Sequence, residues 1–263
     1  MGFISRLKAM KIQSATTIAV ESMKYLLSVK NFESRLDEES RKLMRARPTA
    51  VPLYNALERL KRKRSRSEIN KIIHEIETAK YAAARNASKI FTHKATVLTH
   101  CHSSFVVSAI VRNRQKIKEV IVTETRPRDQ GVTTAKELLS KGIKISFIID
   151  SAISDFIKRT DAVVVGADAL RKEGLVNKVG THPLALVAKE NGKPFYVVTS
   201  SFTIDKRPKI IMEQRPASEL AHEDLRGAKI FNPAFDITPW KYVTAIITEK
   251  GVTRPGKKQR ASP

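Results

Sequence analysis

The sequence has little that could form cross-links or enter a membrane. Cys101 is the one cysteine among 263 residues, so the chain cannot form an internal disulfide and is compatible with a reducing compartment. No apolar run reaches the roughly 18 residues that a membrane-spanning helix needs. The first residues also lack the apolar core and the small-residue cleavage site of a secretory signal. We therefore expect a cytoplasmic protein with no membrane partner.

Aromatic and acidic residues are also scarce. Phe, Trp and Tyr make up 6% of the chain, too few and too scattered for a base-stacking surface. Lys and Arg number 49 against 26 Asp and Glu, which gives a formal net charge of +23. This charge raises the question of a nucleic-acid partner, but the basic runs at 61–66 and 257–260 belong to no zinc-finger, RNP-like or helix-turn-helix pattern. A solvated basic surface is the simpler interpretation, and nucleic acid stays an open alternative.

Apolar periodicity divides the chain into two parts. Residues 1–90 carry apolar residues at helical spacing and no strand-like run, which predicts an N-terminal helical domain. From residue 91, helix-like segments alternate with short apolar runs at 95–98, 120–123, 145–149, 162–165, 195–199 and 243–248. This alternation is typical of an α/β fold, so we expect residues 91–263 to form a Rossmann-like, mainly parallel sheet domain that carries the active site. Thr134 and Glu137 form a capping-box pattern that predicts a helix start.

Chemistry-bearing residues follow two of these apolar runs. Residues 95–105 read A-T-V-L-T-H-C-H-S-S-F, so Cys101 lies between two histidines at the end of an expected strand. Ser103 and Ser104 then begin a helix, whose unpaired backbone N–H groups attract phosphate. Asp168 follows another run, after Gly166 and Ala167. Because such sheets bind ligands at the carboxyl ends of their strands, we expect these residues to face a phosphorylated small molecule.

Each of these residues also has a structural interpretation. Cys101 could be a small buried apolar side chain, and Asp168 could cap a helix. No other Cys or His lies at ligand spacing, so no metal is expected, and the absence of G-x-G-x-x-G gives no support for a dinucleotide cofactor. Arg126 and Lys178 are either surface charges or phosphate contacts. Asp236, in the proline-bounded segment 232–239, either pins a neighbouring loop or binds a hydroxyl group.

Five segments resemble, in the same order, those of one known family. T-H-C-H-S, V-T-E-T-R-P, G-A-D-A, N-K-V-G-T and N-P-A-F-D-I-T-P are similar to segments of the eukaryotic initiation factor 2B alpha, beta and delta subunits and of their sugar-phosphate isomerase relatives. The segment that begins at Arg47, R-P-T-A-V, also looks like one in the archaeal ribose-1,5-bisphosphate isomerases. The resemblance covers most of the chain and is closest to these isomerases.

The resemblance implies a reaction and a set of site residues. The reaction is the isomerisation of ribose 1,5-bisphosphate to ribulose 1,5-bisphosphate in nucleotide salvage, by a dimer or hexamer of identical chains without a cofactor. By motif, the proton-transfer pair of the enzymes falls on Cys101 and Asp168. A thiol with a lowered pKa is suited to be the base and a carboxyl group kept protonated to be the acid. The implied substrate-binding residues are Gln13, Ser14, Ala15, Arg47, Ser103, Ser104, Asn177 and Lys178.

Two positions depart from the pattern of the enzymes. Where they carry Arg-Gly-Ala to hold phosphate, this chain has Gln13, Ser14 and Ala15, and Thr203 stands where they carry a lysine after the fifth strand. The missing cations motivate an alternative, an initiation-factor-2B-like subunit that binds the factor delivering initiator tRNA. A 5-methylthioribose-1-phosphate isomerase, which uses a similar pair, is a second alternative. Keeping both Cys101 and Asp168 favours an enzyme.

Overall fold

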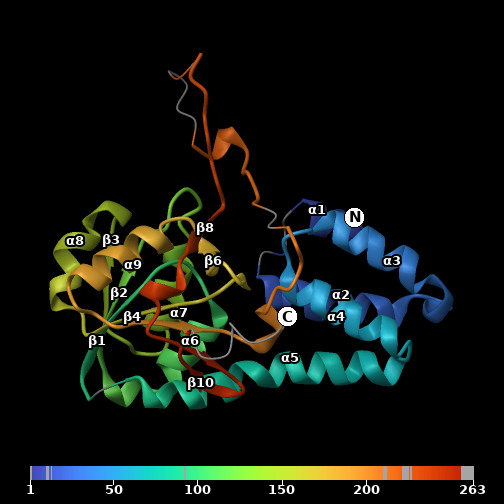
Figure 1. The fold of residues 1–263 in the computed structure, drawn as a ribbon, viewed down its shortest axis with the longest axis horizontal. Helices are drawn as coiled ribbons and strands as arrows, with labels where there is room; N and C mark the ends of the chain where they lie inside the picture. The colour runs from blue at the N-terminus through green and yellow to red at the C-terminus, as the bar shows by residue number, and fades with distance from the viewer. Residues whose placement is uncertain are drawn as a thin grey trace.

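The computed structural model in Figure 1 describes residues 2–9, 12, 14–91, 93–209, 212–220, 225 and 227–255. Gln13 and the basic run at 257–260 lie outside the described residues. The chain is helical up to Asn86 and then alternates between strands and helices. The predicted fold class, a helical N-terminal part followed by a mainly parallel sheet, is confirmed. The predicted domain boundary at residue 90 stays a prediction.

The N-terminal part packs its helices around one apolar core. Phe32 and Leu60 are fully buried there, and each such side chain contributes about 1.5–3 kcal/mol on leaving water. The side chains of Ser14 and Ser65 accept backbone N–H bonds at two helix starts, and Pro52 lies in a first turn, where its missing N–H has no helical partner to lose. The helices are α1 (Phe3–Lys8), α2 (Ala15–Ser28), α3 (Phe32–Ala46), α4 (Val51–Arg62) and α5 (Arg66–Asn86).

The central sheet has seven strands in the order β10-β9-β7-β4-β1-β2-β3. All neighbouring pairs are parallel except β9 and β10. The chain leaves β1 toward β2 and β3 and later builds the other half of the sheet from β4, so the strand order reverses between β1 and β4. The bounds are β1 (Ala95–Thr99), β2 (Ile117–Thr123), β3 (Ile145–Ile148), β4 (Ala162–Val165), β7 (Phe195–Val198), β9 (Ala245–Thr248) and β10 (Gly251–Thr253).

Helices cover both faces of this sheet (Figure 1). The second half of α5 packs on one face with α6 (Ser104–Arg112) and α7 (Gln130–Leu139), and α8 (Ile153–Phe156) and α9 (Thr181–Glu190) pack on the other. Successive strand residues serve the two cores in turn, as Val97 and Leu98 do. Because both faces are buried, the strands are continuous apolar runs, which made them visible in the sequence.

Helix α5 belongs to both cores. Ile72 packs among the N-terminal helices, whereas Ala83 packs against the sheet. Figure 1 shows α5 running beneath both parts of the molecule. A single rigid element therefore fixes the N-terminal helices beside the sheet. Within the part of the chain that the structure describes, no helix is both long enough and apolar enough to cross a membrane.

A small antiparallel sheet was not expected from the sequence. It consists of β5 (Ala169–Leu170), β6 (Leu175–Lys178) and β8 (Phe235–Thr238). The segment 232–239 was expected to form a rigid loop, and this is wrong for residues 235–238, because Asp236 lies in β8 and pairs with Asn177 of β6. These strands are short and partly polar, and their pairing joins segments far apart in the chain. Short polar strands and long-range pairing both lack the local apolar pattern by which a strand is predicted from sequence.

The start of α7 also differs from the prediction. The helix begins at Gln130, and Thr134 lies inside it, buried, rather than at its cap. The hydroxyl of Thr134 donates to the backbone carbonyl of Cys101 at 3.1 Å. The capping-box pattern was therefore wrong for the helix start, because Thr134 is used in a tertiary contact.

Candidate active site

The reversal of strand order places the site. Open α/β sheets bind ligands outside the strand ends where the order reverses. Here Cys101 follows β1 closely and Asp168 follows the neighbouring β4. Both residues line one cavity of about 420 Å³, a size typical of small-molecule sites. The sequence prediction that these two residues face a common space agrees with this placement.

Most of the predicted site residues line this cavity, but several do not. Those that line it are Ser14, Ala15, Arg47, Cys101, Ser103, Ser104, Asp168, Asn177 and Lys178. Arg126, Asp236 and Thr203 do not line it, and Gln13 lies outside the described residues. The cavity thus joins the N-terminal helices to the ends of β1, β4 and β6.

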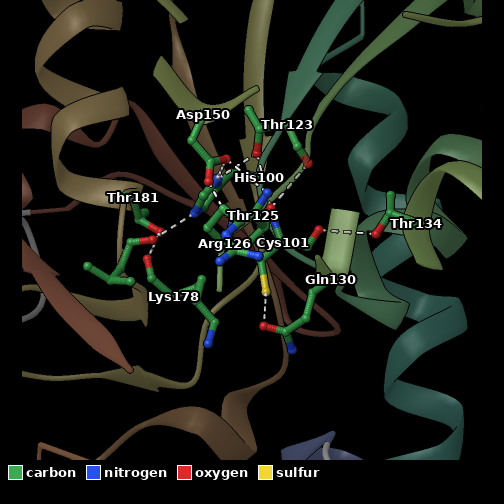
Figure 2. Close-up of polar contacts among 12 residues, drawn as sticks. His100, Cys101, Thr123, Thr125, Arg126, Gln130, Thr134, Asp150, Lys178 and Thr181 are labelled. Atoms are coloured by element: carbon green, nitrogen blue, oxygen red, sulfur yellow. Dashed lines mark hydrogen bonds and ion pairs between the residues drawn. The ribbon is translucent and has the colours of Figure 1, made fainter. Parts of the chain in front are cut away.

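Cys101 is held in an unusual backbone conformation. Its φ is 68°, in the left-handed region that non-glycine residues seldom adopt. Its backbone N–H donates to Thr125 Oγ1 at 2.9 Å, and its thiol donates to Gln130 Oε1 at 3.5 Å. In Figure 2 the thiol, the Gln130 amide and the Lys178 ammonium all extend toward the same side. The backbone conformation therefore directs the sulfur toward the other polar groups of the cavity.

Burial governs the protonation of both candidate catalytic groups. Burial raises the pKa of the Cys101 thiol to about 12, against the opposing effect of the Lys178 ammonium. Burial also raises the pKa of the Asp168 carboxyl to about 6, where Lys178 and Arg47 oppose the shift and Glu213 adds to it. The expectation that the Cys101 thiol has a lowered pKa, as a base would, is therefore wrong. At neutral pH the thiol carries its proton and the carboxyl group is mostly ionised.

His100 connects strand ends and does not face the cavity. Its side chain is buried, its Nε2–H donates to the Val179 carbonyl at 2.9 Å, and its Nδ1 accepts from the Thr123 hydroxyl at 2.7 Å. Burial lowers the pKa of His100, which agrees with a neutral ring. Gly180 has φ +102°, and a Cβ atom there would lie 2.9 Å from the ring, so glycine is required. His100 thereby ties β1 to the start of α9.

His102 lines the cavity in a defined tautomer. The Thr134 hydroxyl donates its proton to a carbonyl, so His102 Nδ1 must donate to Thr134 Oγ1, 3.1 Å away. Burial lowers the pKa of His102, which agrees with a neutral ring. Among the described residues, no group of three or more His, Cys, Asp or Glu side chains could hold a metal ion.

Four cations and two helix starts make the cavity suited to an anionic ligand. The cations that line it are Arg47, Arg128, Lys178 and Arg215. The first residues of α2 and α6 also line it, and their unpaired N–H groups favour phosphate. Lys178 is buried, its ammonium lies 5.7 Å from the centre of the Phe235 ring, and its charge acts to lower the pKa of Asp168.

Two predicted supporting residues, Arg126 and Asp236, and the departing position Thr203 lie outside the cavity. Arg126 is exposed and pairs with Asp129 at 3.6 Å. Asp236 Oδ2 accepts the backbone N–H groups of Gly180 and His182 at 2.8 and 3.0 Å, so it caps α9 and pins the preceding loop. Thr203 is buried and donates to the Ser200 carbonyl at 2.7 Å. It does not replace a phosphate-binding lysine.

Several residues that line the cavity were not predicted from the sequence. Arg128 and Gln130 belong to the polar segment after β2, but the pattern could not show that these two, rather than Arg126, turn inward. Glu213 and Arg215 come from a segment without helical or alternating periodicity, and no local signal marked them. The missed residues supply two of the four cations, Arg128 and Arg215, together with carboxylates that pair with them.

The basic run at 61–66 is largely engaged by this chain. Lys61 pairs with Glu58, Arg64 pairs with Asp37, and Arg66 donates to backbone carbonyls of the α2 end. Residues 61–66 are all exposed, which agrees with the interpretation of the run as a solvated basic surface.

Comparison with known proteins gives two kinds of relative. The sequence model of the Initiation factor 2 subunit family matches residues 7–255. A ribose 1,5-bisphosphate isomerase of Archaeoglobus fulgidus is 37% identical over 95% of this chain and 88% of its own. A 5-deoxyribose 1-phosphate isomerase of Moorella thermoacetica is 34% identical over 96% of this chain and 85% of its own. The crystal structure of translation initiation factor eIF-2B from Pyrococcus horikoshii covers 97% of this chain and 96% of its own, with a TM-score of 0.85 at 29% identity.

Proposed function

The chain belongs to the Initiation factor 2 subunit family, and from this premise we propose that it is an aldose–ketose isomerase that converts ribose 1,5-bisphosphate to ribulose 1,5-bisphosphate. One observation carries the proposal: a single cavity holds Cys101 and Asp168, both with raised pKa values, among four cations. Shifts of this kind in a cleft are typical of catalytic groups. We further propose that the protein acts as a homo-oligomer in the cytoplasm and takes part in nucleotide salvage.

The charge of the cavity supports a bisphosphate. Each phosphate carries about −1.5 to −2 near neutral pH, so the substrate brings two anionic groups. The start of α2, with Arg47 beside it, and the start of α6, with Ser103 at its N-cap, offer two separate anion sites in the same cavity. The arginine that the resemblance leads one to expect near residue 13 is absent, and Arg128 and Arg215, which line the cavity and also pair with Glu219, are the cations nearest to that role.

The reaction needs proton transfers and no net oxidation. The C1–O4 bond breaks, its electron pair moves to O4, and O4 takes a proton. A proton leaves C2 and another arrives at C1, while O2 loses its proton as C2 becomes a carbonyl. C2 is oxidised as C1 is reduced within one molecule. General acid–base groups near these atoms are therefore sufficient.

The protonation states support a division of these steps between the two groups. The Cys101 thiol, protonated at neutral pH, donates to O4 and later takes the proton from O2. The Asp168 carboxylate takes the proton from C2 and returns it to C1, because a pKa of about 6 allows both transfers. Each group ends in its starting state. This order reverses the roles that the resemblance implied, with Cys101 as base and Asp168 as acid.

Two other functions compete with this proposal. 5-Methylthioribose 1-phosphate, like 5-deoxyribose 1-phosphate, has one phosphate and would leave part of the positive charge unused. A subunit that binds the factor delivering initiator tRNA is supported by the similarity to the eIF-2B structure and by the net charge of +23. A thiol and a carboxyl group that line one cavity and both have raised pKa values are of no evident use to a binding surface, which favours the enzyme.

A substrate comparison tests the proposal. Turnover of ribose 1,5-bisphosphate, 5-deoxyribose 1-phosphate and 5-methylthioribose 1-phosphate is followed by NMR with the purified protein. One charge-assisted phosphate contact is worth about 1.5–3 kcal/mol, so kcat/KM should favour the bisphosphate by about 10- to 150-fold. Arg47→Gln should raise KM for the bisphosphate with a smaller change in kcat. A preference for either monophosphate assigns the rival activity. No turnover of all three, with salt-resistant binding to the tRNA-delivering factor, assigns the binding role.

A further inference from the structure

Two adjacent strand ends adopt the same unusual conformation. Cys101 after β1 has φ 68°, and Thr125 after β2 has φ 63°. A β-branched residue such as threonine is a clear outlier in this region. Such conformations persist only where the surrounding structure enforces them, and they gather at functional sites. Specific contacts must therefore hold Cys101 and Thr125 in this conformation.

A continuous set of hydrogen bonds joins the ends of β1, β2 and β3 (Figure 2). The Cys101 N–H donates to Thr125 Oγ1 at 2.9 Å, and the Thr125 N–H donates to Asp150 Oδ1 at 2.9 Å. The other carboxylate oxygen of Asp150 accepts the Arg126 N–H at 2.8 Å. The Thr125 hydroxyl lies within hydrogen-bond distance of Thr123 as well. Each unusual conformation is thus fixed by a side chain from the next strand.

We propose that Thr125 and Asp150 are positioning residues for Cys101, which direct its thiol into the cavity by holding its backbone. The proposal rests on the proposed function only in taking Cys101 as a reacting group. Neither Thr125 nor Asp150 lines the cavity, so they act through Cys101 and not on the substrate. Thr125 is fully buried, and its hydroxyl accepts the N–H that Cys101 would otherwise leave unpaired.

Four variants separate positioning from general stability. Thr125→Val removes the hydroxyl and keeps the β-branched shape, and Thr125→Ser restores the hydroxyl. Asp150→Ala removes both acceptors for the backbone N–H groups. Thr238→Val is the matched control, because Thr238 is fully buried and its hydroxyl has no hydrogen-bond partner among the described residues. For each variant we measure kcat, KM, the thermal midpoint and the rate of Cys101 alkylation by iodoacetamide.

Thr125→Val and Asp150→Ala should lower kcat by about 10²-fold with KM within about twofold, since a displacement of about 1 Å has effects of that size. Alkylation should accelerate by about tenfold, as expected if the released thiol loses about one pKa unit on relaxing toward solvent. Thr125→Ser and Thr238→Val should match the wild type. Alkylation at the wild-type rate in Thr125→Val overturns the proposal whatever the substrate is. Equal losses of kcat in Thr125→Val and Thr238→Val overturn it too.

Discussion

The cavity is built from two sets of residues that are held in different ways. The sheet-edge set, Cys101, Asp168, Asn177 and Lys178, follows or ends strands. The flanking set, Ser14, Arg47, Glu213 and Arg215, comes from the N-terminal part and from the 212–220 segment. Backbone hydrogen bonds fix Asp168, Asn177 and Lys178, whereas the Cys101 N–H is held by the Thr125 hydroxyl. Side-chain contacts fix the flanking set, such as the 2.9 Å ion pair of Arg215 with Glu213 and the 2.6 Å bond from Arg47 to the Ile12 carbonyl.

This difference matches two kinds of chemical task. Proton transfer needs groups in fixed positions and a low dielectric constant, which strand ends within a packed sheet provide. Phosphate recognition needs positive charge and N–H donors, which side chains on flanking segments can supply. The two sets are also coupled, because Glu213 raises and Arg47 lowers the pKa of Asp168. A change in the flanking set should therefore tune the sheet-edge set without removing it.

The largest effects are expected from the sheet-edge set. Cys101→Ser and Asp168→Asn should each lower kcat by about 10²–10⁴-fold, the range that positioned acid–base groups supply. The thermal midpoints should stay near that of the wild type. Asp155→Asn is the matched control, since Asp155 is exposed on α8 and does not line the cavity. Normal turnover in both Cys101→Ser and Asp168→Asn would remove these residues from the mechanism.

The pH dependence of kcat/KM tests the coupling between the sets. If the ionised Asp168 is the base, kcat/KM should fall about tenfold per pH unit as the pH drops below about 6. A group that must instead be protonated would give a loss as the pH rises through the same value. Substrate phosphate also titrates near pH 6, with pKa about 6, so Glu213→Gln serves as the control. This variant should move the acidic limb to lower pH, because Glu213 raises the pKa of Asp168. If the acidic limb of the kcat/KM profile stays at the same pH in Glu213→Gln, the limb reports the titration of the substrate phosphate and not of Asp168.

The two sets also differ in how far the sequence could predict them. Cys101 and Asp168 follow apolar runs, and the rule that ligands lie at strand ends places them together without further information. Lys178 was found by its motif, although its strand was not, because β6 pairs only with distant segments. Glu213 and Arg215 gave no signal, since tertiary contacts alone bring them to the cavity. The pKa of Cys101 was missed for the same reason: burial depends on the whole fold.

The smallest expected effect distinguishes two arginines in the segment after β2. Both are exposed, but Arg128 lines the cavity and lies 3.8 Å from Glu219, whereas Arg126 pairs with Asp129 at 3.6 Å and does not line it. Arg128→Gln should raise KM for the bisphosphate about tenfold, because a charge-assisted contact is worth at least about 1.5 kcal/mol. Arg126→Gln should change KM by less than about twofold, since exposed ion pairs contribute little. Steady-state kinetics on both variants, with thermal midpoints as the folding control, compares them directly. A larger effect of Arg126→Gln would restore the residue that the sequence first indicated and would show that this part of the cavity rearranges around the substrate.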